Sequence, residues 1–96
     1  MIRANLSQAK SYYLASTPYY SLHGTAVNIS CNVGDYIIGT SNYNETPTLS
    51  GMTLINKVED STHQSYISLY VATSATPTFT SGGAAGETNL VVMEPV

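Results

Sequence analysis

Charged side chains are scarce in this chain of 96 residues: they make up 9% of it, against about 25% in an ordinary soluble domain. Only three are basic, Arg3, Lys10 and Lys57, which is too few to line a phosphate backbone, so we expect no nucleic-acid partner. The small net charge of −3 leaves little electrostatic repulsion against self-association, which suits a protein that sits in an assembly.

Cysteine and long apolar runs are also nearly absent. Cys31 is the single cysteine, so no intramolecular disulfide can form, and a disulfide-stapled secreted domain is excluded. Because Cys31 falls on the apolar side of a strand pattern and has no basic neighbour, we expect a buried structural thiol rather than a nucleophile. No apolar run approaches the ~20 residues of a membrane span, and the first ten residues lack the apolar core of a signal peptide.

The sequence motifs of the common chemistries are missing too. No G-x-S-x-G, C-x-x-C, H-x-x-x-H or EF-hand spacing occurs. Glu59, Asp60 and His63 fall in one polar stretch that offers oxygens and an imidazole to an ion, but charges at a hairpin tip ordinarily serve solubility. Asp35 follows a glycine and is interpreted as a turn residue that bonds to its own backbone. We therefore expect no metal, no cofactor, no catalytic residue and no enzymatic activity.

Ser, Thr and Asn take the place of the missing charges, and these residues solubilise strands and turns. Residues 64–74 show the strand pattern relative to which we interpret the rest of the chain. In it Ile67, Leu69 and Val71 recur at every second position, which predicts a strand with one face in a core. Other segments can be interpreted as partner strands for this one.

Four further segments have strand character. Residues 20–31 are predicted to form one long strand bent at a glycine, and residues 26–41 a hairpin around a glycine turn. Residues 49–58 resume strand character, with the side chains of Met52, Leu54 and Val58 expected on one face. Residues 90–93 are apolar on both sides, as expected of a central strand or of one whose outer face is also covered.

This pattern of roughly six to eight short strands, with turn signals between them, predicts an all-β fold. We expect a single antiparallel β-sandwich of jelly-roll or immunoglobulin-like topology, with a small barrel as the alternative. Residues 1–20 are predicted to be a Tyr-rich N-terminal arm or first strand, and the first ten of them an extended arm or a short helix. Residues 21–96 are predicted to be the sandwich domain.

Tyrosines gather at the N-terminal end. Four of the eight, Tyr12, Tyr13, Tyr19 and Tyr20, lie within nine positions of one another. Tyrosine joins a large apolar body to a polar tip and suits contacts with a protein or a sugar ring, although its strand propensity also explains the cluster. Adjacent strand residues point to opposite faces, so at least one tyrosine of each pair is expected outside the core. These four are the candidate interaction residues.

Four runs carry a resemblance to a known group of domains. They are C-N-V-G-D-Y-I-I-G-T (31–40), L-S-G-M-T-L (49–54), S-L-Y-V-A-T (68–73) and N-L-V-V-M-E (89–94). Over roughly residues 26–94 the chain resembles small β-sandwich domains of bacteriophage virion proteins and of bacterial surface proteins. The matching motifs are structural, so the resemblance carries over no functional residue.

The resemblance implies a non-enzymatic structural protein of a virion, such as a capsid decoration protein or the base of a head fibre. Its partners would be further copies of itself, in a homo-oligomer, and a larger assembly such as a major capsid protein, contacted through residues 1–20. The alternative is a carbohydrate-binding or adhesin module, for instance at a bacterial cell surface, that uses its exposed tyrosines to hold a glycan. A small hydrolase is the least supported interpretation.

Overall fold

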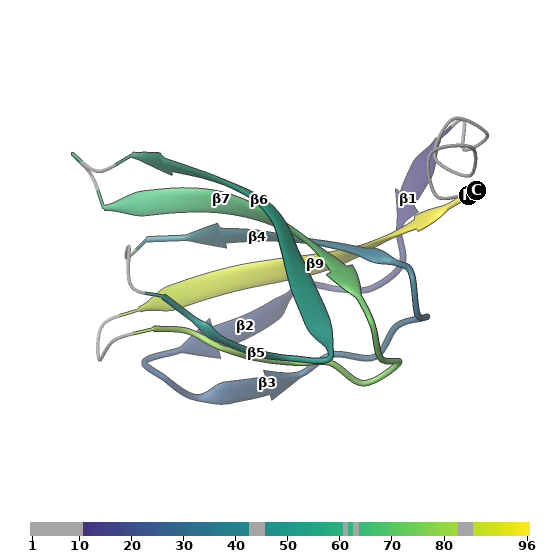
Figure 1. Cartoon of the computed structure of the whole chain (residues 1–96), viewed down its shortest axis with the longest axis horizontal. Coiled ribbons are helices and arrows are strands. Elements are labelled where there is room, and N and C mark those ends of the chain that lie inside the picture. The colour runs from purple at the N-terminus through teal and green to yellow at the C-terminus, as the bar shows by residue number, and fades with distance from the viewer. Residues whose placement is uncertain (1–10, 43–45, 61, 63, 83–85) are drawn as a thin grey trace.

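The computed structural model describes residues 11–42, 46–60, 62, 64–82 and 86–96. Within these ranges the chain forms nine strands and no helix, which confirms the all-β prediction (Figure 1). The expected helix or arm at residues 1–10 lies outside the described residues. The strands are β1 (Tyr12–Leu14), β2 (Tyr19–Leu22), β3 (Ala26–Asn28), β4 (Tyr36–Ser41), β5 (Thr48–Ser50), β6 (Met52–Asp60), β7 (Ser65–Ala72), β8 (Thr78–Thr80) and β9 (Glu87–Pro95).

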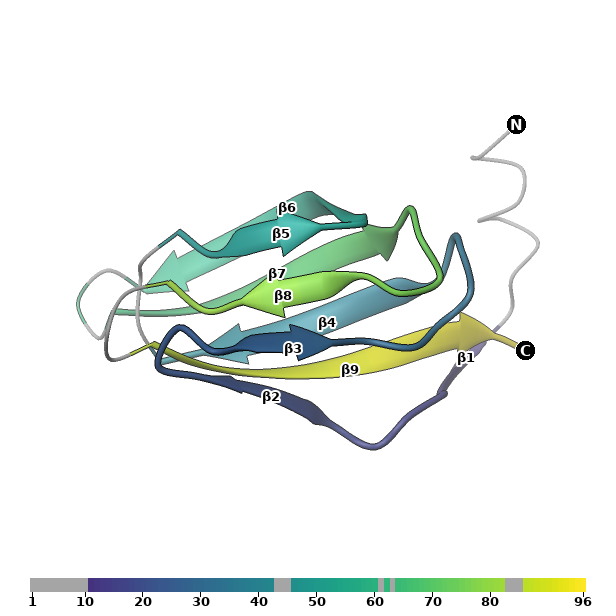
Figure 2. The same cartoon turned by 90° about the horizontal axis from the view of Figure 1, so that it is seen from below.

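The strands make two antiparallel sheets that lie face to face (Figure 2). The larger sheet has the order β1-β9-β4-β7-β6, and β2 pairs with the same edge of β9 that β1 uses further along. The smaller sheet has the order β3-β8-β5. The predicted domain boundary at residue 20 thus falls inside β2, and the tyrosine-rich residues on its N-terminal side contribute β1 and the start of β2 to the larger sheet.

The predicted hairpin at residues 26–41 is wrong. The strand β3 pairs with β8, whereas β4 pairs with β7 and β9, so the turn between β3 and β4 crosses from one sheet to the other. In this turn the Asp35 N–H donates to the Asn32 carbonyl at 3.0 Å. A turn signal fixes where the chain reverses, but not which strands it will pair with, because those pairings are long-range.

The predicted single strand at residues 20–31 is likewise two strands in different sheets. The chain turns at His23 and Gly24, whose φ angles are 53° and 76°, and the Thr25 N–H donates to the Leu22 carbonyl at 3.0 Å. Only the part before the turn stays in the larger sheet, as β2.

Residues 49–58 also divide between the sheets, at Gly51, where φ is 73°. Beyond it, the register of β6 against β7 shifts between Leu54 and Asn56, so that Ile55 is an extra residue in a β-bulge. Met52 pairs with a buried residue of β7, but Val58 pairs with Ile67 on the opposite face. The prediction that Val58 shares a face with Met52 is therefore wrong, because a bulge of one residue inverts the alternation beyond it.

The core lies between the two sheets. The larger sheet contributes Ile37, Tyr70, Leu90 and Val92, and the smaller sheet and its loops contribute Ile29 and Phe79, all at most 1% exposed. The rings of Tyr70 and Phe79 meet edge to face, with their centroids 5.9 Å apart. Phe79 sits on the middle strand of the smaller sheet, opposite both Val27 and Leu49.

The strand β7 has one face in the core, as predicted, but its aliphatic face is the other one. The buried side chains are Tyr66, Ser68, Tyr70 and Ala72. Ile67 is 58% exposed, and Leu69 and Val71 are only half-buried. Gly39 lies opposite Ser68 in the sheet, so small side chains on the inner face leave room for the aromatic rings of the core.

The strand β9 is a central strand, as predicted for residues 90–93. It has β1 and β2 along one edge and β4 along the other. Leu90 and Val92 face the core, while Val91 and Met93 share the outer face with residues of β4. The strand β9 is therefore apolar on both sides, and its outer side continues the apolar outer surface of β7.

Candidate functional site

The outer face of the six-stranded sheet carries apolar side chains that are not part of the core. The smaller sheet covers only the inner face, and no described segment lies over the outer one (Figure 1). Residues that pair across strands share a face, so the register defines three rows on it. From one end to the other the rows are Met93–Tyr36–Val71, Val91–Ile38–Leu69 and Asn89–Thr40–Ile67.

A groove of about 710 Å³ occupies the end of this face nearest the first row. We call it the outer groove; its lining residues are Tyr12, Tyr36, Ile38, Ile55, Leu69, Val71 and Met93. The ring of Tyr12 meets that of Tyr36 edge to face, with 5.7 Å between their centroids. None of these described lining residues carries a charge, so the groove offers apolar contact to a ligand and only the two tyrosine hydroxyls as polar groups.

The other end of the same face exposes two large apolar side chains. Ile67 on β7 and Val58 on β6 pair with each other there, and they are 58% and 66% exposed. The bulge at Ile55 is the reason that Val58 reaches this face at all. Large apolar side chains left this exposed, next to an apolar groove, are typical of an interaction surface.

The four candidate tyrosines are divided between the two faces by strand alternation. Tyr12 and Tyr20 pair with Pro95 and Asn89 on the outer side, whereas Tyr13 and Tyr19 pair with Glu94 and Leu90 on the inner side. The prediction that one of each adjacent pair lies outside the core is thus confirmed. Only Tyr12 lines the outer groove, and the involvement of all four in an interaction stays a prediction.

The environments of the other three tyrosines differ. The Tyr13 hydroxyl donates to Glu94 Oε1 at 2.8 Å, and the side chain is 49% exposed. Tyr19 packs against the core, and its hydroxyl accepts the Ser30 N–H at 3.2 Å. Tyr20 is 48% exposed on β2.

A cluster of two carboxyl groups closes one end of the molecule. Asp35 is 5% exposed and accepts the Asn32 N–H at 2.9 Å, as predicted for a turn residue that bonds to backbone. Asn32 also donates from its side chain to Glu94 Oε2 at 3.2 Å. Desolvation by burial, followed by the hydrogen bond to Glu94, raises the pKa of Asp35 to about 6.

The second carboxyl group of this cluster responds in the opposite direction. Hydrogen bonds donated first by protonated Asp35 and then by Tyr13 lower the pKa of Glu94. The pair therefore shares one proton at mildly acidic pH. It links the turn before β4 to β9 and, through Tyr13, to the edge strand β1.

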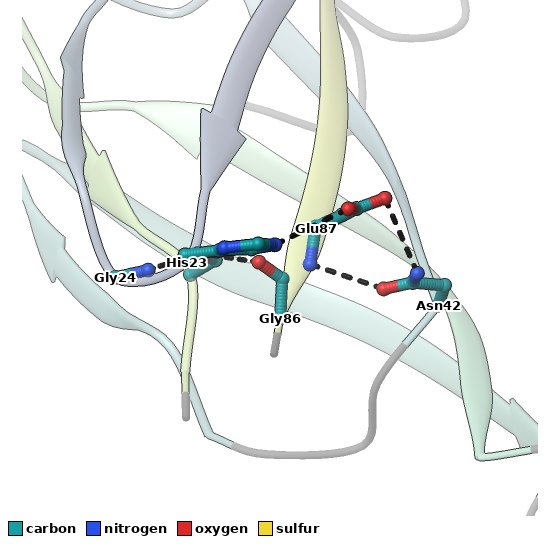
Figure 3. Close-up of polar contacts among 6 residues, drawn as sticks. His23, Gly24, Asn42, Gly86 and Glu87 are labelled. Carbon is teal, nitrogen blue, oxygen red and sulfur yellow. Dashed lines mark hydrogen bonds and ion pairs between the residues drawn. The ribbon is translucent and has the colours of Figure 1, made fainter. Parts of the chain in front are cut away.

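A polar contact closes the opposite end (Figure 3). His23 Nε2 lies 3.4 Å from Glu87 Oε2, and the Glu87 N–H donates to the Asn42 side chain at 3.0 Å. The His23 N–H donates to the Gly86 carbonyl at 2.7 Å, which ties the turn after β2 to the start of β9. These contacts connect neighbouring strand ends at one edge of the molecule, and we interpret their role as structural.

The remaining sequence candidates do not come together as a site. Cys31 is half-buried, and its thiol donates to the Ser74 carbonyl at 3.6 Å; burial raises the pKa of this thiol, which disfavours the thiolate. Among the described residues no three potential metal-ligating side chains cluster, and His63 lies outside them. The described part of the chain also contains no helix that could cross a membrane.

Searches for relatives give no lead to function: no protein-family model, no curated protein and no solved structure matches this chain. The outer face is therefore the basis for assigning a function. The sequence carries one signal of that face, the run Leu90–Met93, which is apolar on both sides. The groove itself joins β1, β4, β6, β7 and β9, and no local pattern could have located it.

Proposed function

We propose that this chain is a non-enzymatic structural protein that docks into a larger protein assembly through the outer face of its six-stranded sheet. The observation that carries the proposal is the uncharged outer groove lying beside the exposed Ile67 and Val58. Water contact with such a face is unfavourable, since each Å² of apolar surface removed from water contributes about 25 cal/mol. An assembly that covers the face gains this free energy.

Strand order supports a more specific fold type, the jelly roll. The order β2-β9-β4-β7 in one sheet faces β3-β8-β5 in the other, and β5 leads directly into β6. Early strands thus lie beside late ones in both sheets, as they do in a double Greek key. Jelly rolls occur in viral capsid proteins and in lectins, and by analogy this favours the same two classes here.

Between these two classes, the chemistry of the outer groove favours a protein partner. A sugar presents many hydroxyl groups and needs several converging donors and acceptors, together with an aromatic platform. Aliphatic side chains dominate the groove instead, and the two exposed tyrosines, Tyr13 and Tyr20, lie outside it on opposite faces of the sheet. We therefore assign the chain to virion structural proteins of the capsid-decoration or head-fibre kind, ahead of a carbohydrate-binding module.

Two valines provide a matched test. Val58 lies on the outer face and Val33 in the turn before β4, and both are 66% exposed. The full chain and its Val58→Asp and Val33→Asp variants are mixed with purified tailed-phage capsids and sedimented through sucrose. We expect the full chain and Val33→Asp to sediment with capsids, and Val58→Asp to remain in the supernatant.

The same three proteins are applied to a glycan array. Binding to a glycan that is equal in all three, without sedimentation on any capsid, would refute the proposal and establish the carbohydrate-binding alternative. Equal sedimentation of both valine variants would remove the outer face from the proposal.

A further inference from the structure

We propose that the outer groove is occupied by a second copy of this chain, so that two chains pack outer face to outer face about a two-fold axis. The inference rests on the proposed function and deepens it: the partner on the outer face is a second copy, the pair of chains is the unit that joins the larger assembly, and Val58→Asp prevents joining because it prevents pairing. Three properties of the face support it: the order of its apolar rows, its charge and its area.

The apolar rows of the face match one another under a two-fold rotation. The groove lies at the row that contains Tyr36 and Val71, and the exposed Ile67 lies about 13 Å further along the strands. A two-fold axis that lies in the interface, at right angles to the strands and over the middle row, brings Ile67 of each copy onto the other copy's groove. In this arrangement Ile67 of one chain faces Val71 of its partner.

The charge distribution is compatible with the same operation. None of the described residues that line the outer groove is charged, so a charged partner would leave its own charge buried and uncompensated. Two acidic residues also belong to the outer side, Glu87 on β9, which is held by His23, and Asp60 on β6, which pairs with Ser65. Both lie beyond the row of Asn89 and Ile67, at the same end of the face. The two-fold axis places the Glu87 ends of the two copies at opposite ends of the interface, where they do not repel each other.

The area of the face is that of a stable interface. Five strands abreast, β1, β9, β4, β7 and β6, span about 24 Å at ~4.8 Å per strand. The eight residues of β7 span about 27 Å at ~3.4 Å per residue. The product is about 650 Å², close to the ~800 Å² per partner of a standard interface. A ten-residue segment such as residues 1–10, laid along the face fully extended, is one strand wide and covers about a fifth of it.

Sedimentation equilibrium of the full chain from about 1 to 200 µM tests the inference. We expect a mass approaching twice the 10.2 kDa of one chain at the upper end. Val58→Asp puts an unpaired charge into the interface twice, by symmetry. If each of the two charges weakens binding tenfold or more, the dissociation constant of the dimer should rise at least about a hundredfold. Val33→Asp should associate like the unaltered chain, and thermal melts confirm that both variants fold.

A charge-pair experiment tests the two-fold geometry itself. Val71→Lys and Ile67→Glu should each abolish the dimer when alone, because each meets an apolar side chain of an identical partner. Mixed in equal amounts they should form a heterodimer. In it the lysine introduced at position 71 of one chain faces the glutamate introduced at position 67 of the other, while the second contact keeps its native Ile67 and Val71. A mixture that stays at 10.2 kDa overturns this arrangement.

The outcomes also separate this inference from the proposed function. A full chain that remains at 10.2 kDa throughout, or a Val58→Asp variant that dimerises like the unaltered chain, overturns the second-copy assignment. If a monomeric chain still sediments with capsids in a way that Val58→Asp abolishes, the proposed function stands and its partner is a different protein. A dimer that binds no capsid leaves the inference standing and refutes the virion assignment.

Discussion

Ile37 and Ile67 lie on neighbouring strands, β4 and β7, but on opposite faces of the six-stranded sheet. Ile37 is 0% exposed between the two sheets, and Ile67 is 58% exposed on the outer face. Replacing each by alanine therefore compares one residue type at two levels of burial. The comparison tests which face of the sheet forms the core, on which the proposed function depends.

The expected costs follow from burial. Ile37→Ala removes a fully buried side chain and leaves a cavity, and such changes cost about 2–5 kcal/mol. Ile67→Ala removes a side chain that is 58% exposed, so it loses less than half of the roughly 1.5–3 kcal/mol that full burial provides, about 1 kcal/mol or less. For a domain of this size, a loss of about 3 kcal/mol lowers Tm by roughly 12–24 °C, and one below about 1 kcal/mol by less than roughly 8 °C.

Urea unfolding and thermal melts should be recorded at submicromolar concentration, because a second copy bound to the outer face would stabilise the folded state by mass action. At that concentration Ile67 contributes only to the single chain. Equal losses for the two variants, or a larger loss for Ile67→Ala, would refute the assignment of the inner face and with it the outer groove.

Three further predictions concern the closed end, a turn and the core. The raised pKa of Asp35, about 6 against an ordinary 3.8, means that the folded state holds this proton more tightly than the unfolded state. The stability that this proton contributes is complete below pH 3.8 and is lost as pH rises to about 6. Urea unfolding from pH 4 to 8 should show this loss in the unaltered chain but not in Asp35→Asn. Identical pH profiles for the two proteins would contradict the shared proton. Alanine at Gly51 would place its Cβ 2.8 Å from a serine Cβ, with φ at 73°, and should cost about 1–3 kcal/mol in thermal melts, more than alanine at Gly34, whose added Cβ meets nothing within 4 Å. Ser41→Ala breaks the buried 2.6 Å hydrogen bond to Thr88 and should lower the free energy of unfolding by about 1–3 kcal/mol. Adding Thr88→Val should restore most of this loss, because no unpaired hydroxyl then remains. A double variant that loses the sum of the two single costs would contradict the coupling of these two hydroxyls.

Local features of the structure were predictable where a local cause decides them. The alternation in residues 64–74 predicts β7, and the turn after residue 33 is marked by a glycine-containing sequence. The rule that adjacent tyrosines point to opposite faces separates Tyr12 from Tyr13 and Tyr19 from Tyr20. Residues 90–93 were expected to be a central strand or one whose outer face is also covered, and the central position is confirmed.

Pairing errors arose where a partner far along the chain decides the outcome. The strands on either side of the turn at Asn32–Asp35 look like a hairpin, yet β3 meets β8 and β4 meets β9, some fifty residues later. The face of Val58 was mispredicted because the bulge at Ile55 is a property of the register between β6 and β7. Both effects determine the lining of the outer groove, because β6 contributes to it through the bulge and β9 through its long-range pairing.

The sequence by itself determined that this chain is all β and uses its tyrosines in pairs that straddle a sheet. It also determined that charged side chains are few and that only three of them are basic. Only the tertiary structure decided that Tyr70 and Ser68, rather than Ile67 and Leu69, point into the core. The physical reason is that alternation specifies a period but no direction. The direction comes from what faces the strand: Phe79 and the close approach at Gly39 accept rings and small side chains, and the aliphatic side chains are left on the outer face.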